Sequence, residues 1–442
     1  MSSIVESRRA LLGLTVPVYC ELLSGVVAGI IDTAWVARLG EAAVGAVAVA
    51  STLENVLLGV ILMVNIGTTV LIADALGGGR RGELAVAVRA AASLWLVITP
   101  IVAAGGFLLR DEVAGLLVGG DGEVHRLAVA FFAISLPGVA VFYAQNVIDG
   151  IFKGTGDTRT PMRMAILANG CILVLDPLLI YGIGPLPELG VRGAALGMLL
   201  GRAVALGVAL TLLRRRLMTG APAGPGLAAA MARILGVGLP ASGEFVLRMG
   251  IGATLIGIVA RFGAEPLAAY GIGTKVILFV TMAFYAFRQA GGIMVARARG
   301  SGGNEDRLIG QQSRLLATVT GAVAGLLLAV SGRAVLGVFS SDPAVLDSGA
   351  TLFWYLWPYL ILLAGVIALG GVFMGGGQTR SLLAVTVFGA CVQIPSAYAL
   401  SSVPVLGVQG VWLSMVIGTG AQYAVTHILF RRTHDESRQA GR

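Results

Sequence analysis

The chain has 442 residues, of which 57% are hydrophobic and 12% are charged, and its formal net charge is +8. With a mean hydropathy of +0.89, this balance excludes a soluble globular protein and indicates a polytopic membrane protein. Surplus arginine is typical of the cytoplasmic flanks of membrane helices, so we expect no nucleic-acid partner. Three cysteines lie in apolar runs without CxxC spacing, so we expect neither a disulfide framework nor a metal site.

Apolar segments long enough to cross a bilayer recur along the whole chain, at about 20 residues for each span. We predict twelve spans, an all-α fold, at 10–37, 46–76, 87–108, 124–152, 161–183, 191–213, 232–262, 266–298, 308–331, 346–374, 381–402 and 408–430. The first run is too long for a signal peptide and has no obvious cleavage site, so we expect it to remain as a helix.

Basic residues are unevenly divided between the loops on the two sides. The side that would hold both termini carries about three times as many as the other, so we place both termini in the cytoplasm. The opposite loops carry Arg38, Arg110, Arg126, Arg192, Arg261 and Arg333.

An internal repeat relates the two halves of the chain. A shift of 223 residues superposes Pro17 on Pro240, and a shift of 221 superposes the turn at 152–159 on the turn at 373–380. We therefore expect two six-helix lobes, related by a pseudo-two-fold axis along the membrane normal. The predicted domains are an N-terminal lobe at 1–213, a cytoplasmic linker at 214–226, a C-terminal lobe at 227–430 and a cytoplasmic tail at 431–442.

Two acidic residues lie deep within apolar spans. Asp32 is in the first span and Asp176 in the fifth, both in the outer half by residue count. An aspartate at mid-membrane costs about 2.5–3.5 kcal/mol, so each is a functional candidate. A buried carboxyl group binds a proton more readily than one in water, and it can instead hold a small cation or a cationic substrate. Mutually exclusive binding of this kind is a simple basis for antiport; the alternative is a structural acid bonded to a neighbouring helix.

Three further candidates are polar residues near these acids or related by the repeat. Asn169 lies seven residues before Asp176 on nearly the same helix face, where it would orient the carboxylate or help to bind a cation; the alternative is a polar contact that joins two helices. Glu21 and Glu244 are repeat partners, which favours a shared structural role over a cavity role. Arg248 follows Glu244 at i+4 and is its expected ion-pair partner.

Motifs of nucleotide-driven or enzymatic chemistry are missing from the sequence. There is no P-loop, no nucleophile elbow and no cluster of metal ligands, so we expect no enzyme activity, no cofactor and no ATP-driven transport by this chain alone.

Several motifs, in their order along the chain, resemble those of the MATE (multidrug and toxic compound extrusion) family and of its DinF-type branch. They are Asp32-Thr33 in the first span, GTGDTRTP before the fifth, LDPLLIYG within it, LGVRGAA before the sixth and the GGGQTR echo. The resemblance covers almost the whole chain. It implies a two-lobed antiporter of twelve helices that exports cationic or amphipathic compounds in exchange for protons or sodium, with Asp32 as the coupling carboxylate.

This chain departs from the family pattern at two oxygen-bearing positions. Ile172 stands where the family commonly has Asn, and Met198 stands where it often has Thr. A hard cation requires several oxygen ligands, so we expect protons rather than sodium.

Our hypothesis is a monomeric secondary exporter in the cytoplasmic (inner) membrane, embedded in the lipid bilayer and carrying small molecules by alternating access. A flippase for lipids or lipid-linked glycans is the alternative, but it would require a strongly basic central cavity. A channel is the other alternative, for which Asp32→Asn would leave flux intact.

Overall fold

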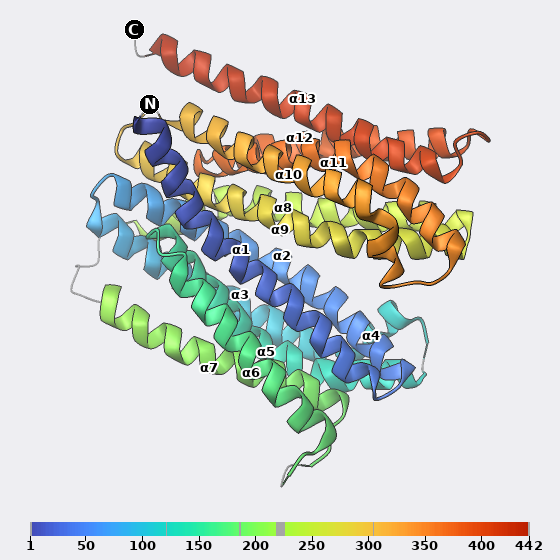
Figure 1. Cartoon of the computed structure of the whole chain (residues 1–442). Coiled ribbons are helices and arrows are strands. Elements are labelled where there is room, and N and C mark those ends of the chain that lie inside the picture. Colours follow the sequence, from blue (N-terminus) through green and yellow to red (C-terminus); the bar gives the residue numbers. More distant parts are fainter. Residues whose placement is uncertain (1, 121, 185–186, 218–225, 304, 441–442) are drawn as a thin grey trace. The chain divides into compact units, whose positions relative to one another are not determined.

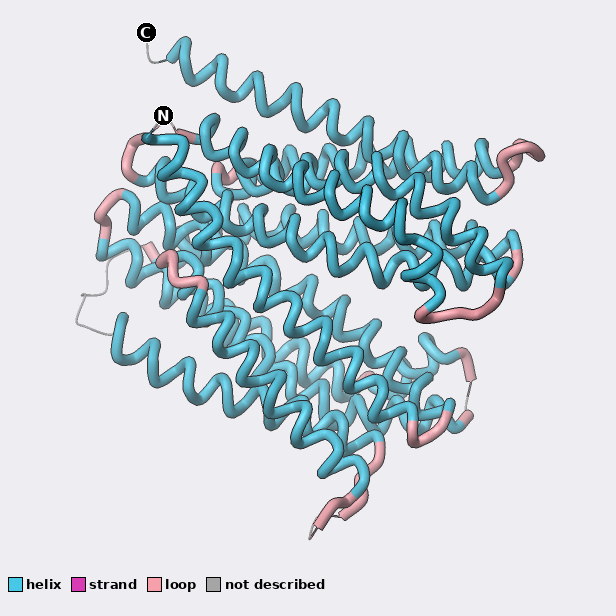
Figure 2. Tube along the Cα trace, viewed as in Figure 1, coloured by secondary structure: helices cyan, strands magenta, loops and turns pink. Residues whose placement is uncertain are grey.

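The computed structural model describes residues 2–120, 122–184, 187–217, 226–303 and 305–440 (Figure 1). Within these residues the chain is helical and forms no strand, as Figure 2 shows. Twelve of the helices are long and apolar enough to cross a membrane, which confirms the predicted all-α class and number of spans. The helices are α1 (Ser2–Ala37), α2 (Glu41–Gly77), α3 (Arg81–Leu108), α4 (Arg110–Val118), α5 (Glu123–Gly154), α6 (Arg159–Tyr181), α7 (Val191–Leu217), α8 (Leu227–Val259), the 3-10 turn η1 (Ala260–Phe262), α9 (Ala264–Gly300), α10 (Asp306–Gly337), α11 (Pro343–Gly375), α12 (Thr379–Ser401) and α13 (Val408–Ala440).

The short helix α4 was not predicted, because its nine residues are fewer than a span needs and include charged ones. Helix α7 continues into the predicted linker as far as Leu217, while 218–225 lie outside the described residues. Helix α13 continues through most of the predicted tail, to Ala440.

Two compact units make up the fold: one is Cys20–Leu239, and the other is Met1–Tyr19 together with Pro240–Arg442. Both boundaries fall inside a helix and beside a proline, Pro17 in α1 and Pro240 in α8. A proline inside a helix removes one backbone hydrogen bond and favours a bend there. The boundaries of the compact units therefore differ from those of the lobes predicted by the repeat. The unit Cys20–Leu239 includes the first part of α8, and the other unit includes the first part of α1.

The unit Cys20–Leu239 is built around α5. Helices α2, α3 and α7 pack against it, and α6 packs along α7. The buried side chains of Phe131 and Phe132 fill the space between these helices near one end of α5, and Tyr143 lies in a second cluster with Ile234 from the start of α8. In lipid there is no hydrophobic driving force between helices, so the close packing of such side chains fixes which helix faces meet.

The other unit is built around α11, against which α9, α10 and α13 pack. Its core contains Phe284, Phe353 and Trp412, with the Trp412 ring stacked on Tyr270 at 5.3 Å between centroids. Leu11 of α1 belongs to this core.

The repeated turn has the same backbone conformation in both copies. Gly156 has a φ of 83° and Gly377 a φ of 71°, in the left-handed region that favours glycine. In the first copy the next residue, Asp157, accepts hydrogen bonds from the amide and the hydroxyl of Thr160 at 3.0 and 2.6 Å, and so caps the start of α6. The turn therefore sets where α6 begins, and so fixes the position of Asp176 along the helix.

Candidate ion-coupling site

The carboxyl groups of Asp32 and Asp176 lie within hydrogen-bonding range of each other, between α1 and α6 of the unit Cys20–Leu239. Asp176 is fully buried and Asp32 is 8% exposed. The sequence predicted both residues as candidates but did not predict that they meet. Because α1 and α6 are the first and fifth spans, both run in the same direction, and residues at similar depth can face one another.

Within the described chain, no amide, hydroxyl or amino group donates a hydrogen bond to Asp32 Oδ1 or to either oxygen of Asp176. The other charged groups that act on Asp32 are Glu54 and Arg202, which form an ion pair with each other at 3.6 Å. Among the described residues, no basic side chain forms an ion pair with either acid, since Arg202 pairs with Glu54. Two carboxyl groups at hydrogen-bonding distance require a proton between them, since two carboxylates repel and neither can donate.

Glycines on α7 position Asp176 by letting α6 approach closely. A Cβ atom on Gly197 would lie 2.2 Å from Asp176 Oδ1, and one on Gly193 would lie 2.4 Å from the carbonyl oxygen of Leu179. Small residues at a spacing of four are typical of closely packed membrane helices. Asp176 is therefore enclosed by α7 on one side and directed towards α1 on the other.

Polar and aromatic contacts join α1 to α6 on both sides of the acid pair. The amide of Asn169 donates to the hydroxyl of Ser24 at 2.9 Å. Beyond the acids, the Tyr181 hydroxyl donates to the carbonyl oxygen of Trp35 at 2.5 Å, and the two rings pack edge to face. Asn169 thus joins α6 to α1 and does not donate to Asp176.

Glu21 lies closer than Asp32 to the start of α1, and it pairs with Lys153 of α5 at 2.7 Å between Oε1 and Nζ. Both side chains are largely buried, and the charges of the pair act on Asp149 of α5. The sequence did not predict this pair. Lys153 lies one residue before the end of α5, and its side chain is buried against Glu21. The signal that could have found it is the rarity of lysine, which occurs here only at 153 and 275.

Glu244 and Arg248 lie on α8 in the other unit and form the predicted i+4 pair at 2.8 Å. The sequence did not predict the second partner, Arg288 of α9, whose two terminal nitrogens donate to the two oxygens of Glu244 at 3.2 and 2.6 Å. Glu244 is 1% exposed and accepts hydrogen bonds from both guanidinium groups. Its predicted repeat partner Glu21 also forms a buried ion pair, but with a lysine from a different helix.

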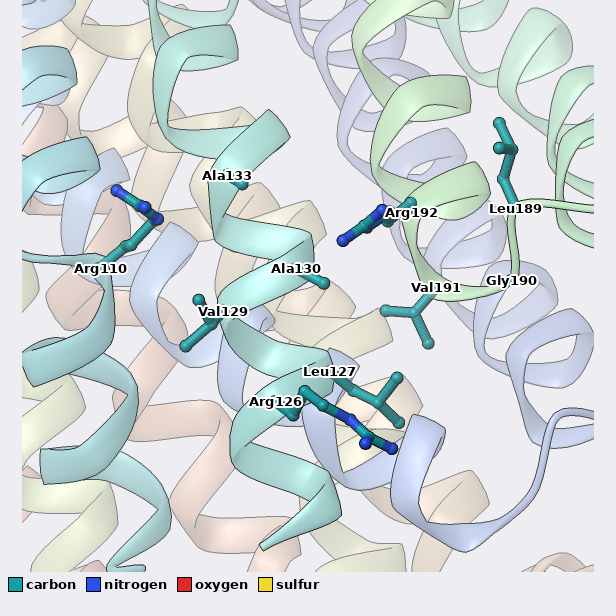
Figure 3. A pocket seen from close by; sticks show the side chains of 10 residues that line it. All are labelled: Arg110, Arg126, Leu127, Val129, Ala130, Ala133, Leu189, Gly190, Val191 and Arg192. Carbon is teal, nitrogen blue, oxygen red and sulfur yellow. The ribbon is translucent and has the colours of Figure 1, made fainter. Parts of the chain in front are cut away.

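A separate cavity of about 560 Å³ in the unit Cys20–Leu239 is lined by residues from the first parts of α4, α5 and α7 and from the loop before α7. Figure 3 shows the side chains of Arg110, Arg126 and Arg192 around it, with apolar residues such as Leu127 and Val191 between them. These arginines were predicted to lie on one side of the membrane, and the structure brings all three to one cavity. No predicted ion-coupling residue lines it. Among the described residues, no group of three or more metal-binding side chains occurs.

Comparison with known proteins gives consistent matches along the chain. A family model described as MatE matches residues 17–178 and 240–399. A probable multidrug resistance protein NorM from Thermotoga maritima is 27% identical over 420 residues, covering 93% of this chain and 89% of that protein. The DNA damage-inducible protein F of Escherichia coli is 25% identical over 440 residues, covering 94% and 90%.

Solved structures match the fold as well. A transporter of the MOP superfamily from Pyrococcus furiosus superposes with a TM-score of 0.88 at 22% identity, over 97% of this chain and 96% of that chain. At this identity the likeness shows the fold alone.

Proposed function

The chain belongs to the MatE family, whose members are transporters and not enzymes, and we propose that it exports cationic or amphipathic small molecules in exchange for protons. The observation that carries this proposal is the carboxyl pair of Asp32 and Asp176. The pair is buried, and no described basic side chain forms an ion pair with it. Relatives that carry multidrug resistance names support the class of cargo.

A carboxyl pair that shares one proton supports exchange by exclusion. Protonated, the pair carries a single negative charge at most, so a cation beside it is stabilised less than beside two carboxylates. Deprotonated, it carries two negative charges in a site of low dielectric constant, where a cationic group is strongly favoured. Uptake of a proton from outside would therefore release a bound cation, and loss of the proton to the cytoplasm would restore the affinity.

The oxygens around the pair favour a proton over sodium. A hard cation takes about six or more oxygen ligands. Ile172 and Met198 supply no oxygen. A proton needs only the two carboxyl groups that are present.

The proposed location is the cytoplasmic membrane, with both termini in the cytoplasm and the chain acting as a monomer. There the membrane potential adds to the pH gradient, because moving a unit charge across 100 mV corresponds to about 2.3 kcal/mol. The lipid or glycan flippase is not favoured, since the chain matches MatE relatives and its buried acids attract cations.

The test is transport of a fluorescent organic cation in inverted membrane vesicles under an imposed pH gradient or an imposed sodium gradient. We expect the pH gradient to drive uptake by the native protein and the sodium gradient to have no effect. Asp32→Asn and Asp176→Asn should each abolish coupled transport, because an amide cannot exchange a proton. Asp111→Asn, which changes an acid that is 73% exposed, is the matched control and should leave transport intact.

Each contrary outcome has a definite meaning. Transport driven only by sodium would refute the proposed coupling ion while leaving the export function standing. Flux that persists unchanged in Asp32→Asn would refute the antiport mechanism and favour a channel. A native protein that moves no cation under either gradient would refute the proposed cargo class.

A further inference from the structure

The unit Met1–Tyr19 with Pro240–Arg442 contains a buried cluster with more positive than negative charge. One carboxylate, Glu244, faces two guanidinium groups, Arg248 and Arg288. The charged groups that act on Glu244 within the described chain are these two arginines alone, and Glu244 is the only carboxylate that acts on Arg248. One positive charge is therefore left over, inside helices that are long and apolar enough to cross the membrane.

The surplus charge belongs to Arg248 rather than to Arg288. Arg288 forms two hydrogen bonds, one to each oxygen of Glu244, which is the strong two-pronged geometry of an arginine–carboxylate pair. Arg248 makes one hydrogen bond, through Nη2, to an oxygen that Arg288 already uses. Its Nε atom is buried and has no partner within the described residues. Its side chain is also the more accessible, at 21% exposed against 8%.

Two tyrosines from neighbouring helices complete the cluster. The hydroxyl groups of Tyr285 on α9 and Tyr359 on α11 lie within electrostatic range of Arg248. Their rings pack against the core of the unit, which holds them in place. Arg248 thus has an N–H donor without a partner, beside two tyrosines that act on it electrostatically.

A surplus guanidinium group with an unpartnered N–H donor recognises an oxyanion. An arginine left without a counter-charge in a membrane protein is costly, and an anionic group that binds it removes this cost. Carboxylates and phosphates fit because guanidinium nitrogens and hydroxyls both donate to such oxygens.

We propose that Arg248, assisted by Tyr285 and Tyr359, binds an acidic group of the transported molecule. The cargo would then carry an acidic group that Arg248 selects, in addition to the cationic group of the proposed export function. This inference rests on the proposed export function and narrows its cargo from cations in general to amphipathic molecules that also carry an acid.

The experiment compares a rhodamine methyl ester, a cation, with its free acid, a zwitterion of nearly the same size and shape. Transport of each dye is measured as KM in inverted vesicles for the native protein, Arg248→Gln, Arg248→Lys and Tyr359→Phe. We expect Arg248→Gln to raise the KM for the acid at least about tenfold relative to that for the ester, as loss of a hydrogen-bonded charge contact predicts. Arg248→Lys should show a smaller loss because it keeps the charge without the planar fork.

Arg333→Gln is the matched control, because Arg333 pairs with Asp347 on the exposed surface of the same unit. It should change neither KM. The decisive quantity is the ratio of the KM values for acid and ester. If Arg248→Gln leaves this ratio unchanged, whether transport of both dyes persists or falls together, the role of Arg248 is structural and the inference is overturned.

A binding measurement separates failure of the inference from failure of the proposed export function. If the native protein transports neither dye, the Kd of each for the purified protein in detergent is measured by fluorescence polarisation. A Kd ratio between acid and ester that changes about tenfold in Arg248→Gln would support the acid site even then. An unchanged Kd ratio would overturn it.

Discussion

Replacing Lys153 by methionine tests its buried ion pair with Glu21, which the sequence did not predict. The Nζ and Oε1 atoms of Lys153 and Glu21 are 2.7 Å apart, and their side chains are only 6% and 13% exposed. Lys153→Met removes the positive charge and leaves the Glu21 carboxylate buried without its partner. Breaking a buried pair in this way costs about 3–5 kcal/mol, whereas replacing both charges by neutral groups is often close to neutral. We therefore expect Lys153→Met to lower the free energy of unfolding by about 3 kcal/mol or more. The double variant Glu21→Gln/Lys153→Met should recover most of that loss.

The assay is unfolding in mixed micelles of mild detergent and SDS, followed by tryptophan fluorescence, for the native protein, both single variants and the double variant. The four values form a double-mutant cycle, which isolates the energy of interaction between the two side chains. Arg333→Met is the control, since its pair with Asp347 is exposed and such pairs contribute about 1 kcal/mol or less. The reasoning is refuted if Lys153→Met unfolds within about 0.5 kcal/mol of the native protein, or if the double variant is no more stable than Lys153→Met.

Three further substitutions test the packing and charge arrangement. Gly197→Ala should disrupt coupled transport and destabilise the protein by about 1–3 kcal/mol, because the added methyl group overlaps the carboxyl group of Asp176. Gly207→Ala, on the same helix with no atom within 4 Å of its Cβ position, is the control and should be neutral; equal effects would contradict the assigned close contact. Glu244→Gln should cost about 3–5 kcal/mol in a micelle unfolding titration, because it leaves two buried arginines without a counter-charge; a loss below about 1 kcal/mol would mean that another anion neutralises them. Asp157→Ala should lower the thermal midpoint through loss of about 0.5–2 kcal/mol of helix capping, and an unchanged midpoint would show that the turn alone fixes the start of α6.

The number and type of the helices were predictable because each span must satisfy its own backbone hydrogen bonds in lipid. Length and apolarity therefore identify a membrane helix without knowledge of its neighbours. The contact between Glu244 and Arg248 was predictable for a similar reason, since helical geometry alone brings residues i and i+4 together. Local rules of this kind were enough to predict each membrane-spanning helix and the Glu244–Arg248 pair within one helix.

Contacts between helices were beyond these rules. Glu21 and Lys153 are 132 residues apart, and Arg288 is 44 residues from Glu244. The hydrophobic pattern did not orient these helices, because a span that faces lipid on one side and protein on the other is apolar all round. For the same reason the sequence placed Asp32 and Asp176 at similar depth but could not show that they face each other. The glycines of α7 were the one available signal, because closely spaced small residues mark the side of a membrane helix that another helix approaches.

The internal repeat kept the scaffold of the two halves but not their charges. The turn glycines at 156 and 377 have the same conformation, and Glu21 and Glu244 correspond. Yet Lys153, the partner of Glu21, corresponds to a methionine in the second half, and Arg288, the partner of Glu244, corresponds to an asparagine in the first.

Backbone positions depend on the packing of many neighbours and are hard to change, whereas a buried carboxylate needs only one base within reach, from any helix. The same freedom explains why Asp32 has an apolar counterpart, Leu255, which is 3% exposed in the core of its unit. A pair of acids in one unit and a surplus arginine in the other are thus two separate electrostatic arrangements on one repeated scaffold. On the proposed mechanism the proton binds in one half, which leaves the other half for the chemistry of the cargo.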